Sequence, residues 1–120
     1  MPQYGYPRSD RLRKKAEYSS CYANGQRHFT RDFIVYVLPK EQGTGSRTGM
    51  AVSKKVGHAV VRNRIKRLLR EFFRLHGRLF HACDIIVVAK KAVRTDLSFQ
   101  EVSADLYPLF ESIFRSYLLT

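Results

Sequence analysis

The residues best suited to chemistry in this 120-residue chain are cationic side chains grouped in one segment, VVRNRIKRLLREFF at residues 60–73. Arginine binds phosphate oxygens in a bidentate manner and stacks on bases, and lysine binds phosphate as a point charge. Helical spacing separates these side chains from the apolar ones, which cluster around Ile65. The charged side and its flanks comprise Arg62, Asn63, Arg64, Lys66, Arg67 and Arg70.

This charged side differs from an ordinary solvated helix face. Solvated faces mix charges of both signs, because Glu–Lys pairs four residues apart stabilise a helix and like charges destabilise it. Here Arg62, Lys66 and Arg70 follow one another at four-residue spacing, and only Glu71 opposes them. Bound phosphates would relieve that repulsion, so the segment favours contact with RNA or DNA. A membrane-surface helix is also basic and amphipathic, but it would not need the strands predicted around this segment.

The composition of the whole chain agrees with an anionic partner. Lys and Arg number 22 against 10 Asp and Glu, a formal net charge of +12. Such an excess opposes compaction by self-repulsion, so it indicates a polyanion, nucleic acid first and an anionic membrane surface second. Cys21 and Cys83 lie in no metal-ligand spacing and suggest a reducing compartment. With no long apolar segment and no signal peptide pattern, we expect a soluble cytoplasmic protein.

Catalytic and metal-binding patterns are not evident. The sequence shows no Ser/His/Asp constellation, no carboxylate pair and no Gly-rich phosphate loop. His28, His58, His76 and His81 lack metal-ligand spacing, and the acidic residues are scattered. We therefore expect no catalytic residue and no metal site in the protein itself, and the pattern argues against a two-metal nuclease centre.

The remaining sequence predicts one α/β domain at residues 11–120 behind a flexible extension at 1–10. Ser98 and Glu101 form a capping-box pattern that starts the last helix, which Pro108 should kink or split. Hydrophobic patterns and turn residues place the other elements. The expected order is a helix at 11–24, strands at 32–39 and 48–57, a helix at 58–76, a strand at 84–91 and the last helix.

Several of these segments resemble one known family. The stretch RTGMAVSKKVGHAVVRNRIKRLLREFFR, residues 47–74, is similar to the signature region of the bacterial ribonuclease P protein subunit. RLRKKAEYSSCYANG resembles the first helix of that family, RDFIVYVL its first strand and DIIVVAKKA the strand after the signature helix. The resemblance runs from Arg11 to about Phe114, and the strand ending in SKKVG just before RNRIKRLLRE is its most specific part.

The resemblance implies a fold and a function. The implied fold is an α/β (α+β) sandwich like domain 2 of ribosomal protein S5, with about four strands, three helices and a left-handed βαβ crossover. General topology rules would favour a right-handed crossover, so the family alone supplies that detail. The implied function is that of a noncatalytic subunit of an endoribonuclease. Its RNA subunit uses Mg²⁺ to remove the 5′ leader from precursor tRNA, and the protein binds both RNAs. Because the residues suggest no dimer interface, we expect a monomer in the absence of RNA.

The resemblance also implies two binding surfaces. Lys54 and Lys55 should join the charged side of the signature helix in binding the ribonuclease P RNA. A cleft lined by Tyr18, Tyr22, Ile34 and Tyr36 should take the single-stranded leader, since aromatic rings beside a sheet can stack on unpaired bases. The residues alone would suggest core positions for these four. His58 stands where many relatives carry Asn.

Two other functions fit parts of the pattern. A ribosomal or RNA-chaperone protein would share the charge and the fold but would belong to no enzymatic complex. A DNA-binding protein would need side chains that read the major groove, usually from a dimer. The arginine density favours backbone contact over base readout, and no dimer interface is evident, so we expect RNA rather than DNA.

Overall fold

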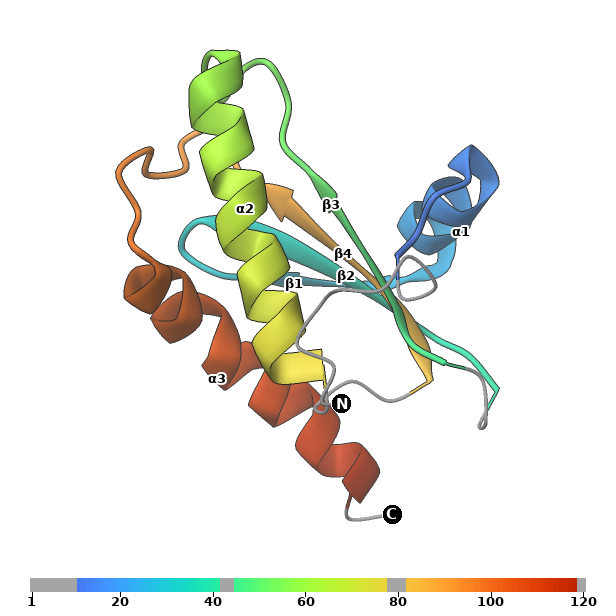
Figure 1. Ribbon diagram of the computed structural model, residues 1–120. Coiled ribbons are helices and arrows are strands. Elements are labelled where there is room, and N and C mark those ends of the chain that lie inside the picture. The colour runs from blue at the N-terminus through green and yellow to red at the C-terminus, as the bar shows by residue number, and fades with distance from the viewer. Residues whose placement is uncertain (1–10, 42–44, 78–81, 119–120) are drawn as a thin grey trace, which may run out of the picture.

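The computed structural model describes residues 11–41, 45–77 and 82–118, with side chains described as far as Arg115. The predicted extension at 1–10 and His81 lie outside these residues. The described residues form three helices and four strands, and the four strands make up one sheet (Figure 1). In chain order the elements are α1 (Lys15–Asn24), β1 (Gln26–Phe29), β2 (Phe33–Pro39), β3 (Arg47–Ala51), α2 (Ala59–His76), β4 (Cys83–Ala89) and α3 (Phe99–Leu118).

The sheet is mixed, with the strand order β1-β2-β4-β3. β2 pairs antiparallel with both β1 and β4, whereas β3 runs parallel to β4. The parallel pair requires a crossover connection, and α2 provides it. β4 is the most deeply buried strand because it lies between two neighbours and is covered on both faces. The predicted four-stranded α/β architecture with three helices is confirmed.

Alternation along β2 divides the hydrophobic core between the two faces of the sheet. Phe33, Val35 and Val37 point to one face and are buried against α2 and α3. The residues between them point to the other face, where α1 packs over Ile86 of β4 through buried Cys21. Figure 1 shows α1 on one side of the sheet and α2 and α3 on the other. The sheet is therefore the middle layer of three.

The apolar side of α2 packs as its helical spacing predicts. Ile65, Leu69 and Phe72 are buried, and Phe73 joins them although it lies near the edge of the expected apolar stripe. The Phe72 ring lies 5.6 Å from the Phe110 ring of α3, which ties the two helices together. Each such side chain contributes about 1.5–3 kcal/mol on burial. This anchoring holds the charged side of α2 toward solvent.

The start of the first helix and one whole strand differ from the predictions. The first helix begins at Lys15, not at residue 11, because the Glu17 carboxylate accepts hydrogen bonds of 3.0 Å from the amides of Arg13 and Lys14. Arg11 instead forms a β-bridge with Thr48. β1, with sequence QRHF, was not predicted, because its exposed residues show no apolar alternation. Its strand geometry comes from pairing with β2.

The other differences lie at strand ends and in α3. β3 ends at Ala51, since the predicted strand at 48–57 turns at residues 54–56. β4 spans residues 83–89, one residue earlier at the start and two at the end than predicted. α3 is not split at Pro108. Proline has no backbone N–H, so the carbonyl of Ala104 lacks its usual helical donor. Both residues are exposed, so water can donate to that carbonyl.

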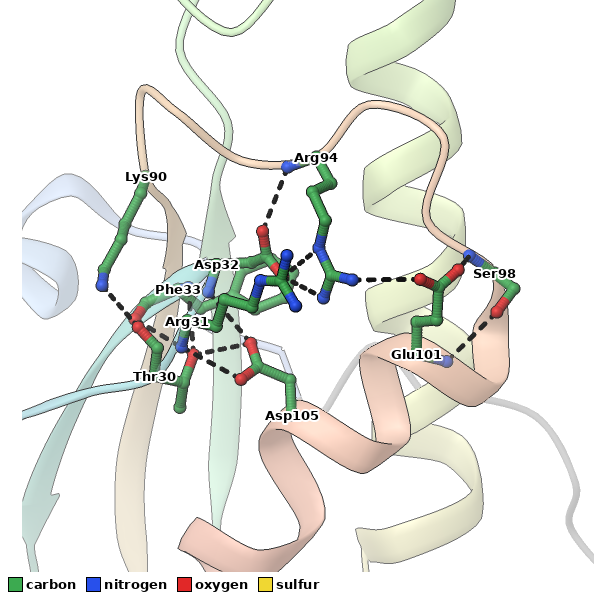
Figure 2. Close-up of polar contacts among 9 residues, drawn as sticks. All are labelled: Thr30, Arg31, Asp32, Phe33, Lys90, Arg94, Ser98, Glu101 and Asp105. Atoms are coloured by element: carbon green, nitrogen blue, oxygen red, sulfur yellow. Dashed lines mark hydrogen bonds and ion pairs between the residues drawn. The ribbon is translucent and has the colours of Figure 1, made fainter.

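A polar network fastens the start of β2 to α3 (Figure 2). Asp32 is 2% exposed and accepts hydrogen bonds from the backbone amide and the guanidinium of Arg94. Arg94 also pairs with Glu101, whose carboxylate accepts a bond from the Ser98 amide while its own amide donates to Ser98 Oγ. The predicted capping box is thus present. Asp105 accepts bonds from the hairpin between β1 and β2, including the Asp32 amide at 3.0 Å.

Candidate nucleic-acid interface

The charged side of α2, which we call the basic column, stands on the outside of the molecule. Arg62 and Lys66 are half-buried, and the other four side chains are exposed. Arg62 Nε donates to the Gly57 carbonyl at 3.2 Å, and Arg64 Nη1 donates to the Thr95 carbonyl at 3.3 Å. These contacts orient two guanidinium groups without neutralising them. The basic column consists of Arg62, Asn63, Arg64, Lys66, Arg67 and Arg70.

The cations of the basic column lack acidic partners. Within the described part of the chain, no carboxylate lies within 4.0 Å of any of them. Glu71, the one acidic residue expected to oppose them, pairs with Arg74 instead, and this pairing lowers the pKa of Glu71. The column therefore has a concentrated positive charge, which an oligoanion such as an RNA backbone can neutralise.

Lys54 and Lys55 extend this positive surface toward the N-terminus of α2. Both side chains are exposed in the turn at residues 54–56, where the Lys55 amide donates to Ser53 Oγ at 3.3 Å. His58 is the N-cap of α2 but makes no side-chain cap hydrogen bond. The amides of the first turn thus keep their partial positive charge next to the lysines. The structure places both predicted lysines beside the basic column.

The second predicted group, which we call the tyrosine surface, consists of Tyr18, Tyr22, Ile34 and Tyr36. Its rings meet across α1 and β2: Tyr22 lies 4.9 Å from Tyr36 in an edge-to-face arrangement and 6.4 Å from Tyr18. Ile34 lies two residues from Tyr36 on the same face of β2. Tyr22 is 39% exposed, and the other three side chains are half-buried. The structure therefore brings all four predicted residues to one face of the sheet.

Close packing below the rings explains their positions. A Cβ atom at Gly49 of β3 would lie 2.6 Å from the Tyr18 hydroxyl, so only glycine leaves room for that ring. Burial raises the pKa of Tyr18 and outweighs an opposing hydrogen bond from the Met50 backbone. Buried Cys21 lies one helical turn from Tyr18 toward the C-terminus of α1 and contacts the Tyr36 carbonyl at 3.9 Å. The packing of Gly49 and Cys21 thus determines where the tyrosine rings lie on the sheet.

An ion-pair network holds α1 against the sheet. Arg47 of β3 pairs with Glu17 of α1 and, at 2.9 Å, with Asp84 of β4. Asp84 is 3% exposed and also pairs with Lys40 at 3.1 Å. Backbone hydrogen bonds from Arg13 and Lys14, with the nearby Arg47 charge, lower the pKa of Glu17 to about 2. The network fixes α1, and with it two of the tyrosines, against the sheet.

The cysteines and histidines occupy varied environments. Both cysteines are buried and no disulfide joins them: Cys21 lies between α1 and the sheet, and Cys83 lies in the core on the opposite face. The His76 ring packs at 4.6 Å from Phe72, whereas His58 is exposed and His28 is half-buried. Across residues 11–41, 45–77 and 82–118, no cluster of three or more His, Cys, Asp or Glu could hold a metal ion.

Sequence reasoning missed one candidate residue, Phe29 of β1. Its ring is 61% exposed, although it lies on the same face as the tyrosine surface, opposite Ile34 in the sheet register. The Arg27 guanidinium and the Lys90 ammonium each lie 5.8 Å from the centre of the ring. Only the strand pairing could have revealed this position, because β1 has no recognisable strand pattern.

Comparison with known proteins decides the family. The Ribonuclease P family model matches residues 6–113. The chain is 50% identical over 118 residues to the ribonuclease P protein component of Desulfovibrio desulfuricans, covering 96% of this chain and 91% of that protein. It is 46% identical over 100 residues to the same component of Shouchella clausii, covering 82% and 81%. The chain belongs to the ribonuclease P protein family.

Solved structures agree with this membership. The Staphylococcus aureus ribonuclease P protein superposes with a TM-score of 0.77 at 34% identity, covering 87% of this chain and 94% of that one. The Thermotoga maritima protein gives a TM-score of 0.73 at 26% identity, covering 85% and 96%. The fold and family expected from the resemblance are confirmed. The chain accordingly has the function of a ribonuclease P protein component in tRNA processing, not that of a ribosomal or chaperone protein.

None of the helices formed by the described residues is both long enough and apolar enough to cross a bilayer.

Proposed function

We propose that this chain binds the catalytic ribonuclease P RNA through the basic column with Lys54 and Lys55, and the 5′ leader of precursor tRNA through the tyrosine surface. The observation that carries the first assignment is the absence of acidic partners for the column's cations within the described residues. Family membership supplies an RNA partner. A rigid helix with unopposed arginines suits the phosphates of a folded RNA, whose backbone geometry it can match without reading sequence.

The tyrosine surface suits a different kind of RNA. Unpaired bases stack on aromatic side chains, whereas the bases of a duplex are already stacked on one another. Tyr22 offers an accessible ring, and the edge-to-face contact with Tyr36 holds both rings in place before RNA arrives. Single-stranded leader is the part of precursor tRNA that mature tRNA lacks. Binding it would favour substrate over product.

Under this proposal the chemistry belongs to the RNA subunit, and the protein supplies no catalytic group. The described carboxylates do not suit a metal centre, since Asp32, Asp84 and Glu17 are already engaged by arginines. We therefore assign the magnesium ions to the RNA and derive no step through a protein-bound ion. The protein lowers the magnesium requirement by neutralising phosphates that would otherwise need cations. It acts as a monomer on precursor tRNA in the cytoplasm.

Precursor-tRNA cleavage at low magnesium tests the subunit assignment. A bacterial ribonuclease P RNA is assayed with and without this chain, and the chain is assayed alone. We expect the protein to restore processing that the RNA cannot perform by itself, and to be inert without the RNA. Unchanged cleavage despite tight binding to the RNA would contradict the assignment and favour a chaperone function.

A substitution in the tyrosine surface tests the leader assignment. Tyr36→Ala should reduce the affinity advantage of leader-bearing substrate over mature tRNA by roughly 5- to 150-fold, since stacking on one base contributes about 1–3 kcal/mol. Affinity for the ribonuclease P RNA should not change, because the ring lies on the opposite side of the sheet from α2. An advantage that survives the substitution would show that the leader binds elsewhere.

A further inference from the structure

The sheet face that carries the tyrosine surface continues beyond it, toward the end of β1. Residues paired directly across neighbouring strands point to the same face. Phe29 is paired with Ile34, and Ile34 with Val88 of β4. Arg27 is paired with Tyr36, so the β1 side chains at 27 and 29 extend this face to the edge of the sheet. The tyrosine surface is thus one part of a longer strip.

α1 covers only one end of this strip. Its buried side chain, Cys21, lies over Ile86 and contacts the carbonyls of Tyr36 and Asp84. Phe29 lies at the other end and belongs to neither hydrophobic cluster of the core. With 61% of its surface exposed, the ring is presented to solvent, not packed. Phe29 is therefore left largely uncovered by the described residues.

The cations beside the Phe29 ring indicate which kind of partner could bind there. The Arg27 guanidinium and the Lys90 ammonium each lie 5.8 Å from its centre. Lys90 also donates to the Thr30 carbonyl, which keeps the ammonium beside the end of β1 (Figure 2). Neither cation pairs with a carboxylate in the described part of the chain. An apolar protein partner would have to bury both charges, whereas a nucleotide provides a base for the ring and a phosphate for the cations.

The distance to the tyrosines suits a continuous strand of RNA. Phe29 is displaced from Tyr36 by two residues along the strand and by one strand across the sheet. Strand geometry makes that displacement about 8 Å. One or two nucleotides of an extended chain can span such a step, and half-buried Ile34 provides an apolar surface between the rings.

We propose that Phe29, flanked by Arg27 and Lys90, is a further base-stacking position that extends the tyrosine surface for unpaired leader RNA. The inference rests on the proposed leader assignment and adds a specificity-determining residue to it. A leader that ends before this position gains nothing from Phe29, and a longer leader gains one stacked base. The chain should therefore discriminate among precursor tRNAs by leader length.

A leader-truncation series tests the proposal with the reconstituted holoenzyme. Dissociation constants are measured for precursor tRNAs whose leaders shorten one nucleotide at a time, with mature tRNA as the end point. Phe29→Ala should weaken binding roughly 5- to 150-fold for long leaders only. Phe29→Trp should restore it, because indole also stacks. Leu75→Ala serves as the matched control, since Leu75 is 48% exposed on α2 and lies outside both proposed surfaces.

The outcomes separate this inference from the function on which it rests. Loss of the leader advantage in Tyr36→Ala, with wild-type behaviour of Phe29→Ala at every length, would overturn the Phe29 assignment alone. Wild-type behaviour of both variants would overturn the leader surface as a whole. Equal weakening of mature tRNA by Phe29→Ala would also overturn the proposal, because the ring would then act on the tRNA body or on folding. Thermal unfolding and affinity for the RNA subunit check that each variant is folded.

Discussion

At the scale of single residues, the charges of this chain divide into structural and unpaired groups. Asp32 and Asp84 are almost fully buried, and each is bound by an arginine. Burial alone would raise the pKa of Asp32, but hydrogen bonds from Arg94 outweigh it and lower that pKa. Breaking such a pair leaves a charge without its partner, which costs more than the pair itself contributes. Loss of one partner of such a pair should therefore destabilise the fold.

Removing the buried carboxylate at position 32 should destabilise the fold. Asp32→Ala deletes the acceptor of the Arg94 bonds at 3.0 Å, and we expect the free energy of unfolding to fall by about 2–3 kcal/mol. Urea denaturation monitored by circular dichroism measures the change. Asp96→Ala is the control, because Asp96 is exposed and should change stability by less than about 0.5 kcal/mol. Equal losses of unfolding free energy in the two variants would contradict a stabilising role for the Asp32–Arg94 pair.

Glu17 should make part of the stability depend on pH. In the folded chain, hydrogen bonds from the amides of Arg13 and Lys14, with Arg47 nearby, lower its pKa from 4.5 to about 2. A lowered pKa means that its contribution is present above about pH 4.5 and is lost as the pH falls through about 2. The difference in unfolding free energy between the wild type and Glu17→Gln should therefore shrink across that window. A difference that stays constant from pH 5 to pH 2 would be the contrary result.

At the scale of elements, α2 combines an anchoring side with the proposed binding side. Ile65, Leu69 and Phe72 are fully buried, which fixes the rotation of the helix about its axis. That rotation points the basic column outward as an ordered row, in contrast to the Arg74–Glu71 pair near its C-terminus. α1 has the corresponding role for the tyrosines, and Glu17 and Arg47 hold it in place. Each proposed surface is thus carried by a helix that is fixed on its other side.

The salt dependence of RNA binding measures the basic column directly. With roughly six phosphate contacts, the logarithm of affinity for the ribonuclease P RNA should fall with the logarithm of salt concentration with a slope of about −4 to −5. Arg67→Ala should make the slope smaller in magnitude by about 0.7–0.9. Arg115→Ala is the matched control, since Arg115 is paired with Glu111 on α3 at 2.8 Å. A wild-type slope near −1 would exclude the column as the interface.

At the scale of the whole molecule, a net charge of +12 on 120 residues conflicts with compact folding. The layered core offsets that repulsion, with the sheet covered by α1 on one face and by α2 and α3 on the other (Figure 1). The five cations of the basic column repel one another along α2, and RNA bound there as proposed would relieve that repulsion. If the basic column is the RNA interface, as proposed, we expect folding and RNA binding to be coupled through the same cations.

Salt should have opposite effects on stability and on binding. Raising sodium chloride from 0.05 to 0.5 M screens the like charges, and we expect the free protein to gain about 1 kcal/mol, or roughly 4 °C in Tm. The same change should weaken RNA binding by counterion release. Differential scanning calorimetry of the protein alone measures the change in Tm, and a parallel titration with RNA measures the change in affinity. A protein destabilised by moderate salt would refute the coupling.

Local sequence patterns predicted most of the architecture but not all of it. β2 and α2 were predicted because their apolar residues repeat at the period of the element itself. β1 was missed because an exposed edge strand such as QRHF carries no such repeat, and only its register with β2 makes it a strand. The start of α1 was misplaced because the side chain of Glu17 determines it, not the hydrophobic pattern.

The amino-acid sequence by itself determined the excess of positive charge, the two-sided character of α2 and the resemblance to one family, because these depend on residue types and short spacings. The tertiary structure alone decided which cations remain unpaired. Arg94 meets Asp32 across 62 residues of sequence, and Arg47 meets Asp84 across 37. Folding alone creates such long-range contacts, and the same holds for the approach of Lys90 to the exposed ring of Phe29.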